Sequence, residues 1–185
     1  SYMIDARLTY LPANARNLKN RERVKFYFGT SEIIGNVVIL DAEEIAPGSE
    51  AFVQIRLTEP AVTLPGDRFV VRLLTPAVTI GGGEILNAVA RKHKRFREQV
   101  IEDVSTLALG RQEERAIVFI KDAGYAGVTA DQLSRRMGLP AEAATRLLGK
   151  LEADGAVVAF DKEKGRRVEA AAYGRLAGLV RERVA

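Results

Sequence analysis

The chain has 185 residues, of which 47% are hydrophobic, and no apolar run approaches the roughly 18 residues that cross a bilayer. It has no cysteine and one histidine, which excludes a disulfide framework and any metal site built from thiolates or several imidazoles. The first residues also lack the pattern of a secretory signal. We therefore expect a cytoplasmic protein with no membrane partner and no metal site.

The formal net charge of +4 is confined to one short segment. Residues 1–89 carry 9 basic and 10 acidic groups, and residues 98–185 carry 14 of each. The surplus lies at Arg91, Lys92, Lys94, Arg95 and Arg97, with no acid between them. Such a cluster attracts phosphate backbones, so these five cations are candidates for nucleic-acid binding. The alternative is a hydrated helix start, because basic runs are common on protein surfaces.

Residues 1–89 have the pattern of successive β-strands. Alternation with period two, or apolar β-branched runs, predict about six strands near residues 4–10, 24–28, 33–40, 51–57, 69–74 and 78–86. This spacing predicts an all-β antiparallel barrel. Gly81, Gly82 and Gly83 interrupt the last strand, which indicates a bulge or close approach of another backbone. A phosphate-binding loop is disfavoured because Glu84 and Ile85 follow the glycines in place of Lys and Ser or Thr.

A basic linker helix is predicted over 90–110. Its apolar stripe, at steps of three and four residues, consists of Phe96, Val100, Val104, Leu107 and Ala108. The unbroken stripe indicates a rigid helix from 92 to 109.

Residues 111–185 have the pattern of an α+β winged helix-turn-helix domain, so the fold class is multidomain. Three helices are predicted near 112–123, 129–138 and 140–155, the second opened by a Thr129-x-x-Gln132 capping box. A hairpin with a polar turn at 161–165 follows, and a closing helix is predicted over 173–184. The third helix and the hairpin supply weaker nucleic-acid candidates: Arg146, Lys150, Arg166 and Arg167. Because Glu142 and Gly149 share that helix face, the alternative is a spacer or protein-docking module.

No catalytic constellation is apparent, and we expect no enzymatic activity in these residues. His93 stands among cations, which disfavour its imidazolium form. The acidic pairs Glu43-Glu44 and Glu113-Glu114 are adjacent in sequence, so their side chains point in different directions.

Three separated segments carry a family resemblance: Gly29-Thr30-Ser31-Glu32, Leu57-Thr58-Glu59-Pro60 and Lys92-His93-Lys94-Arg95-Phe96. In this order they resemble the bacterial selenocysteine-specific elongation factors (SelB), where the third β domain meets the winged-helix tail. The resemblance implies that residues 4–87 are similar to the third domain of elongation factor Tu, which helps to hold aminoacyl-tRNA. Arg68-Phe69 and Thr79-Ile80-Gly81 match motifs beside a loop facing the tRNA there. The implied candidates are Arg68, Arg72, Thr75 and Thr79.

The resemblance also implies the partners. They are selenocysteyl-tRNA, the ribosome and, through further winged helices outside these residues, an mRNA recoding hairpin. GTP and Mg would be bound by other domains, so no cofactor is expected here, and the chain is expected to be a monomer. The function predicted is a noncatalytic segment that contributes to tRNA docking and links the GTPase body to the mRNA-binding tail. The alternative is a winged-helix DNA-binding transcription regulator with a β-barrel sensor domain, although residues 98–185 carry no net charge.

Overall fold

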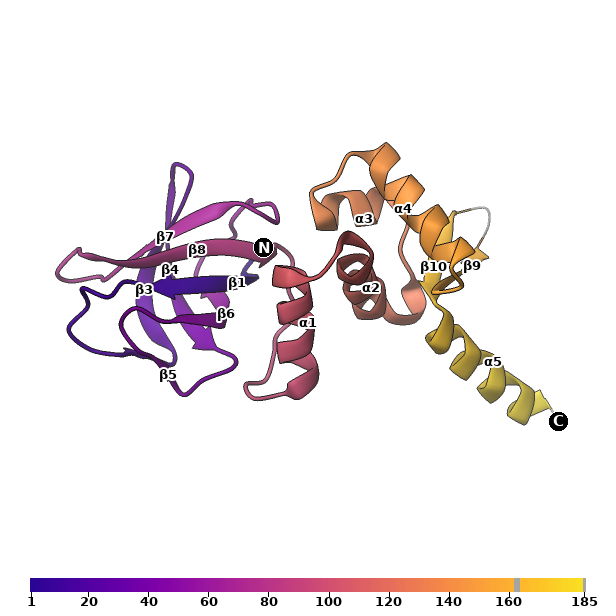
Figure 1. The fold of residues 1–185 in the computed structure, drawn as a ribbon, viewed down its shortest axis with the longest axis horizontal. Helices are drawn as coiled ribbons and strands as arrows, with labels where there is room; N and C mark the ends of the chain where they lie inside the picture. Colours follow the sequence, from indigo (N-terminus) through magenta and orange to yellow (C-terminus); the bar gives the residue numbers. More distant parts are fainter. Residues whose placement is uncertain (162–163, 185) are drawn as a thin grey trace. The chain divides into compact units, whose positions relative to one another are not determined.

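The computed structural model describes residues 1–161 and 164–184, which form two compact units, 1–109 and 110–185 (Figure 1). Part of the turn predicted at 161–165 falls on residues 162 and 163, which lie outside the described residues. In the part of the chain that the structure describes, no helix has the length and apolar character needed to span a membrane.

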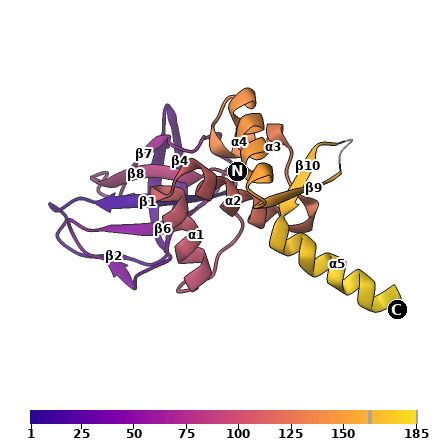
Figure 2. The same cartoon turned by 45° about the vertical axis from the view of Figure 1, so that its right-hand side comes forward.

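The first unit contains a closed barrel of six antiparallel strands, as the alternation predicted. Around the barrel the strand order is β1-β6-β4-β3-β7-β8. The strands are β1 (Met3–Tyr10), β3 (Glu22–Phe28), β4 (Ser31–Ile39), β6 (Glu50–Leu57), β7 (Arg68–Arg72) and β8 (Thr79–Asn87). Two short strands that the sequence did not predict, β2 (Leu18–Lys19) and β5 (Glu44–Ile45), pair with each other; β2 is labelled in Figure 2.

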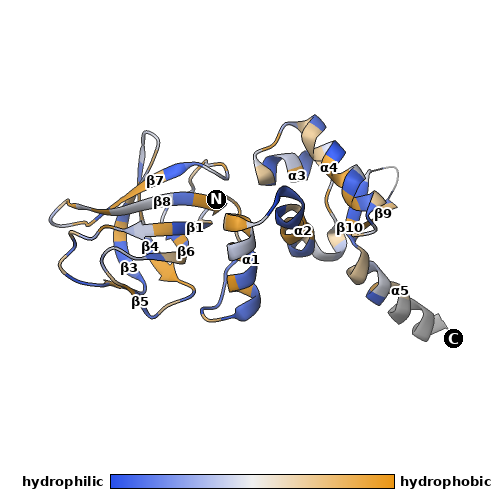
Figure 3. Ribbon diagram, viewed as in Figure 1, coloured by the Kyte–Doolittle hydropathy of each residue, from blue (hydrophilic) through white to orange (hydrophobic). Residues whose placement is uncertain are grey.

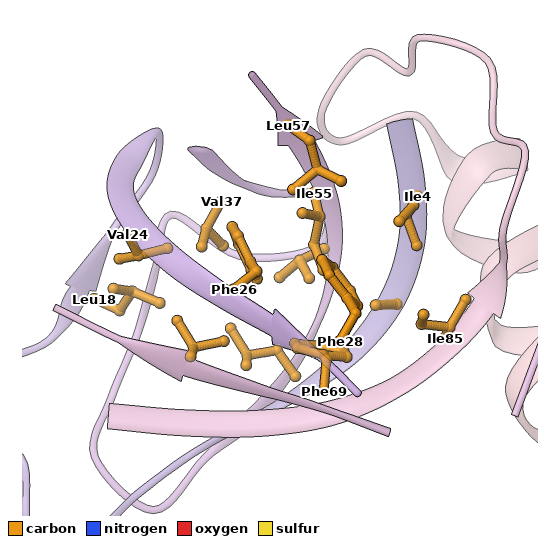
Figure 4. Packing of buried hydrophobic residues seen from close by; sticks show 14 of the residues in the cluster. Ile4, Leu18, Val24, Phe26, Phe28, Val37, Ile55, Leu57, Phe69 and Ile85 are labelled. Atoms are coloured by element: carbon orange, nitrogen blue, oxygen red, sulfur yellow. The ribbon is translucent and has the colours of Figure 1, made fainter. Parts of the chain in front are cut away.

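Alternate side chains of each strand fill the barrel (Figure 4). Phe26, Phe28 and Phe69 form an aromatic cluster with ring centroids 6.0 to 6.1 Å apart. Closure pairs every strand on both sides, which removes the exposed edges that an open sheet would present.

The glycine run of β8 lies between two backbones. A Cβ atom on Gly83 would lie 1.9 Å from the carbonyl oxygen of Arg7, and one on Gly82 would lie 2.7 Å from that of Phe69. A Cβ atom on Gly81 would lie 2.6 Å from the carbonyl oxygen of Thr9. The predicted close approach of another backbone is therefore confirmed, and glycine is required because β1 and β7 flank β8.

The prediction of one basic helix over 90–110 is wrong in its first part. Helix α1 spans Glu98–Leu109, and residues 91–97, which we call the strap, are not helical. Phe96 has a φ of 56°, a left-handed conformation that precludes a continuous helix from the strap into α1. Its side chain is exposed, so it does not extend the apolar stripe. Val104 and Leu107 are buried, and α1 packs against β1, β6 and β8.

The second unit contains the helices and hairpin that the sequence predicted, in the same order. They are α2 (Gln112–Ala123), the 3₁₀ turn η1 (Gly124–Ala126), α3 (Ala130–Met137), α4 (Ala141–Ala153), β9 (Val157–Asp161), β10 (Arg166–Glu169) and α5 (Ala170–Val184). The capping box of Thr129 and Gln132 opens α3, and Gly138 ends it in the left-handed conformation. Buried apolar residues hold α2, α3, α4 and the hairpin together, while their outer faces are largely polar (Figure 3).

Candidate nucleic-acid interface

The strap is fastened to the outer surface of the barrel by Gln54. This side chain is fully buried although it points outward from β6, because the strap covers it. Its Nε2 donates to the carbonyl oxygen of Arg91 at 2.7 Å and to Asp5 Oδ1 at 3.1 Å. Its Oε1 accepts from the backbone N–H of His93 at 3.2 Å and from Arg56 Nε at 3.1 Å. One buried amide thus holds two backbone groups of the strap.

Asp5 is a second buried anchor. It points outward from β1 yet is 1% exposed. Asn87 donates to its Oδ2 at 3.3 Å, and the Nε2 of His93 lies 3.0 Å from the same oxygen. The sequence places His93 among cations, and the fold turns its ring toward the carboxylate of Asp5. His93 joins the strap to β1.

Arg95 is a structural member of the strap. Its guanidinium donates to the carbonyl oxygens of Ile39 at 2.8 Å and Ala42 at 2.7 Å, and it pairs with Glu43 at 3.2 Å. The backbone N–H of Phe96 also donates to Leu40 at 2.9 Å. Because three protein groups accept hydrogen bonds from its Nε and Nη2, Arg95 fastens the strap to the barrel.

The other cations of the strap face solvent. Arg91, Lys92, Lys94 and Arg97 are all exposed. Within residues 1–161 and 164–184, Lys92, Lys94 and Arg97 form no side-chain hydrogen bond or ion pair. Beneath the strap, burial and, to a smaller extent, the charge of Arg21 lower the pKa of the Arg56 guanidinium. The result is a rigid segment with exposed positive charge.

The structure separates the barrel candidates into two places. Arg72 and Thr79 are register partners, and Thr75 is exposed in the loop that joins their strands. The Arg72 guanidinium donates to the carbonyl oxygen of Ala77 at 2.5 Å and lies 5.8 Å from the ring centroid of Tyr27. Arg68 lies at the other end of β7, where its guanidinium is 3.8 Å from Glu84. The loop precedes β8 and the strap follows it, so the two lie at opposite ends of that strand. The strand is about 26 Å long, at about 3.3 Å per residue.

In the second unit, three of the four candidates are engaged by the protein. Lys150 pairs with Glu113 of α2, and Arg167 lies 3.2 Å from Glu152. Arg166 donates to the carbonyl oxygen of Ala126 at 2.9 Å. Arg146 is exposed and has no hydrogen bond or ion pair with any residue that the structure describes. Helix α4 therefore offers a single unengaged cation, which makes a weak groove reader.

Within the part of the chain that the structure describes, neither the glycine run nor a cluster of acidic or histidine side chains offers a site for a nucleotide phosphate or a metal ion. Gly81 to Gly83, the one glycine-rich run, pair with β1 and β7, so their backbone is committed to the sheet. Among the described residues, no cluster of three His, Cys, Asp or Glu side chains is placed to hold a metal.

Sequence reasoning missed three residues at these surfaces. Arg7 lies 3.4 Å from Glu84, beside Arg68, and Lys25 is the register partner of Arg72. Phe96 was assigned to an apolar helix stripe, whereas the residue is 48% exposed among the strap cations. Its position directly inside a basic run was the available signal, because aromatic residues interleaved with cations are typical of RNA-binding surfaces.

Comparison with known proteins gives the family of the barrel. Residues 5–92 match the model of the selenocysteine-specific elongation factor β-barrel domain. The barrel belongs to this family. A selenocysteine-specific elongation factor from Desulfomicrobium baculatum is 31% identical to this chain over 178 residues. That alignment covers 96% of the chain and 28% of the relative, so the chain spans little more than a quarter of this elongation factor.

The fold is also found in a solved structure. A crystal structure of a bacterial selenocysteine-specific elongation factor has a similar fold, with a TM-score of 0.69 and 18% sequence identity. The match covers 98% of this chain and 26% of the chain in that crystal structure. At this identity the match shows the fold alone. The family of the barrel and the shared fold agree with the resemblance seen in the sequence.

Proposed function

We propose that this chain is the noncatalytic segment of a selenocysteine-specific elongation factor that docks selenocysteyl-tRNA and links the GTPase body to the mRNA-binding tail. The observation that carries the proposal is the strap. It presents Lys92, Lys94 and Arg97 to solvent while Gln54, Asp5 and Arg95 fasten it to a barrel of the elongation-factor family.

A fastened strap suits the binding of a phosphate backbone. Cations on a disordered tail lose conformational entropy when they bind, whereas the backbone here is already held by hydrogen bonds. Each phosphate that is neutralised releases counterions, so affinity comes mostly from charge and falls with salt. Arg68 and Arg7 lie near the end of β8 that leads into the strap, and they extend the proposed surface onto the barrel.

We assign the second unit the role of a winged helix-turn-helix connector. The order of α2, α3, α4 and the β9–β10 hairpin supports the assignment. Lys150 and Arg167 are paired with Glu113 and Glu152, which supports a connector over a groove reader. In this proposal the mRNA hairpin, GTP and Mg are bound by other parts of a longer, monomeric, cytoplasmic factor, which acts on the ribosome.

The experiment is a salt-titrated competition assay with labelled selenocysteine tRNA. Competitors are ordinary tRNA, a recoding mRNA hairpin and duplex DNA. The test variant replaces Lys92, Lys94 and Arg97 with Gln. Its control replaces Arg135, Lys164 and Arg175, three exposed cations of the second unit that are not among the binding candidates, with Gln, which changes the net charge by the same amount.

We expect tRNA to compete best and the strap variant to lose affinity. Three lost phosphate contacts reduce the slope of log K against log salt by roughly 2 to 3. The control variant keeps the wild-type slope. Equal loss in both variants would show that only net charge matters, and would refute docking at the strap. Preference for duplex DNA would instead support a transcription regulator.

A further inference from the structure

Phe96 combines exposure, backbone strain and a basic environment at one position. The residue is 48% exposed and its φ is 56°. The exposed Lys94 and Arg97 lie within two residues on either side. We propose that Phe96 is a stacking platform for an unpaired nucleobase of RNA. The inference rests on the proposed function, since it requires that the strap meets RNA, and it adds a ligand contact that charge alone does not supply.

The backbone conformation makes phenylalanine an unusual residue at position 96. A left-handed conformation is favoured by glycine and asparagine and is unfavourable for a bulky aromatic residue. The backbone N–H of Phe96 donates to the carbonyl oxygen of Leu40 at 2.9 Å, which helps to hold this turn before α1. Glycine or asparagine would make the same turn with less strain. Strained residues that the surrounding structure holds in place are concentrated at functional sites.

The ring is already oriented before any ligand binds. The Arg95 guanidinium lies 4.6 Å from the ring centroid and covers one face. That guanidinium is itself held by the carbonyl oxygens of Ile39 and Ala42. Because Arg95 covers one face and the residue is 48% exposed, a flat ligand would stack on the opposite face.

The surroundings select the class of ligand. A base offers a π-face to the ring, and its flanking phosphates suit the exposed Lys94 and Arg97. Bases inside a duplex are already stacked and do not reach a protruding ring. The ligand is thus an unpaired nucleotide, in a loop, bulge or end.

The chain contains no tryptophan, which permits a direct optical test. Phe96→Trp introduces the only indole, and a base stacked on it quenches its fluorescence. The probes are a short single-stranded RNA of mixed sequence, its blunt duplex, and inorganic polyphosphate, which has charge but no bases. Tyr125→Trp, at an exposed position in the second unit, is the control.

We expect quenching of the Phe96→Trp indole by single-stranded RNA and none by polyphosphate. Phe96→Leu should weaken binding of single-stranded RNA by about tenfold, in line with the loss of one stacked base, and should leave polyphosphate binding unchanged. Phe96→Tyr should retain the affinity. Phe96→Asn should lose it and yet be at least as stable to urea, because asparagine tolerates the left-handed backbone.

The outcomes separate this inference from the function on which it rests. If replacing Lys92, Lys94 and Arg97 abolishes binding while Phe96→Leu and Phe96→Asn bind single-stranded RNA as wild type does, the platform is refuted and tRNA docking stands. Equal quenching of the Phe96→Trp and Tyr125→Trp variants by single-stranded RNA also overturns it. If the triple variant binds RNA normally, the proposed function fails, and the platform with it.

Discussion

Replacement of Gln54 with Leu tests whether the strap is held as described. Gln54 is fully buried and forms four hydrogen bonds, with Asp5, Arg56, His93 and the carbonyl oxygen of Arg91. Leucine has a similar size, so the substitution removes the bonds without opening a large cavity. The carbonyl oxygen of Arg91 and the backbone N–H of His93 then lose their hydrogen bonds to this side chain.

The expected loss in the free energy of unfolding follows from the number of hydrogen bonds that the substitution removes. At about 1 kcal/mol net for each hydrogen bond, four bonds contribute about 4 kcal/mol. Greater burial of apolar surface by leucine returns about 1 kcal/mol. The free energy of unfolding should thus fall by about 3 kcal/mol, a large share of the roughly 5 to 15 kcal/mol typical of a domain.

The assay is urea denaturation of the full chain followed by circular dichroism, together with hydrogen exchange of peptides from the first unit. With a slope of about 2 kcal/mol per molar, the midpoint of the barrel transition should fall by roughly 1.5 M. The backbone N–H groups of His93 and Phe96 should exchange faster, because both are bonded to groups beneath the strap. Affinity for tRNA should fall as well, although no cation has been removed.

The matched control is Gln99→Leu. Gln99 is exposed on α1 and forms one hydrogen bond, to Asp103 at 3.0 Å, so its replacement should change stability by less than about 0.5 kcal/mol. If Gln54→Leu left the midpoint and the exchange of the strap at wild-type values, the strap would not be fastened by this amide, and the argument for a rigid cationic surface would fail.

Three further outcomes are expected. Gly83→Ala should destabilise the barrel by about 3 kcal/mol or more in urea denaturation, because its Cβ would lie 1.9 Å from a backbone oxygen of Arg7; a loss below about 1 kcal/mol would contradict that geometry. Gly149→Ala should stabilise the second unit by about 1 kcal/mol, measured by its thermal midpoint, since no atom lies within 4 Å of the new Cβ in a helix interior. The Arg16 side-chain hydrogen bond holds the pKa of Glu22 below its ordinary value of 4.5, so this carboxylate stabilises the barrel above that pH and the contribution is lost as pH falls through the lowered pKa. Glu22→Gln should therefore flatten the acid limb of a stability–pH curve, and an unchanged limb would count against the Arg16 contact.

Much of the fold follows from local pattern. The alternation in Ala51, Val53, Ile55 and Leu57 places these side chains inside a barrel, and all four are buried. The bounds of α2 are those predicted, because its apolar period and terminal glycine are local signals. By contrast, α5 begins at Ala170, earlier than the predicted Tyr173, since little in Ala170 to Ala172 marks a boundary.

The candidate surface could be predicted less completely from the sequence. Five cations within residues 91–97 predicted a basic patch, and four of them are exposed. The pattern did not distinguish Arg95, whose guanidinium is bonded to Ile39 and Ala42, from Lys94, which faces solvent. Neither did it show that Lys150 is paired with Glu113, because those residues are far apart in the chain.

Asp5 and Gln54 show where local pattern stops and tertiary structure decides. By alternation both point away from the barrel interior, and polar residues at such positions are expected in water. Both are buried, because residues 91–97 return across the barrel and bond to them. The periodicity of a strand determines which face a side chain occupies, since it depends on neighbours along the chain. Whether that face meets solvent depends on a segment dozens of residues away, and only the packed structure brings that segment into place.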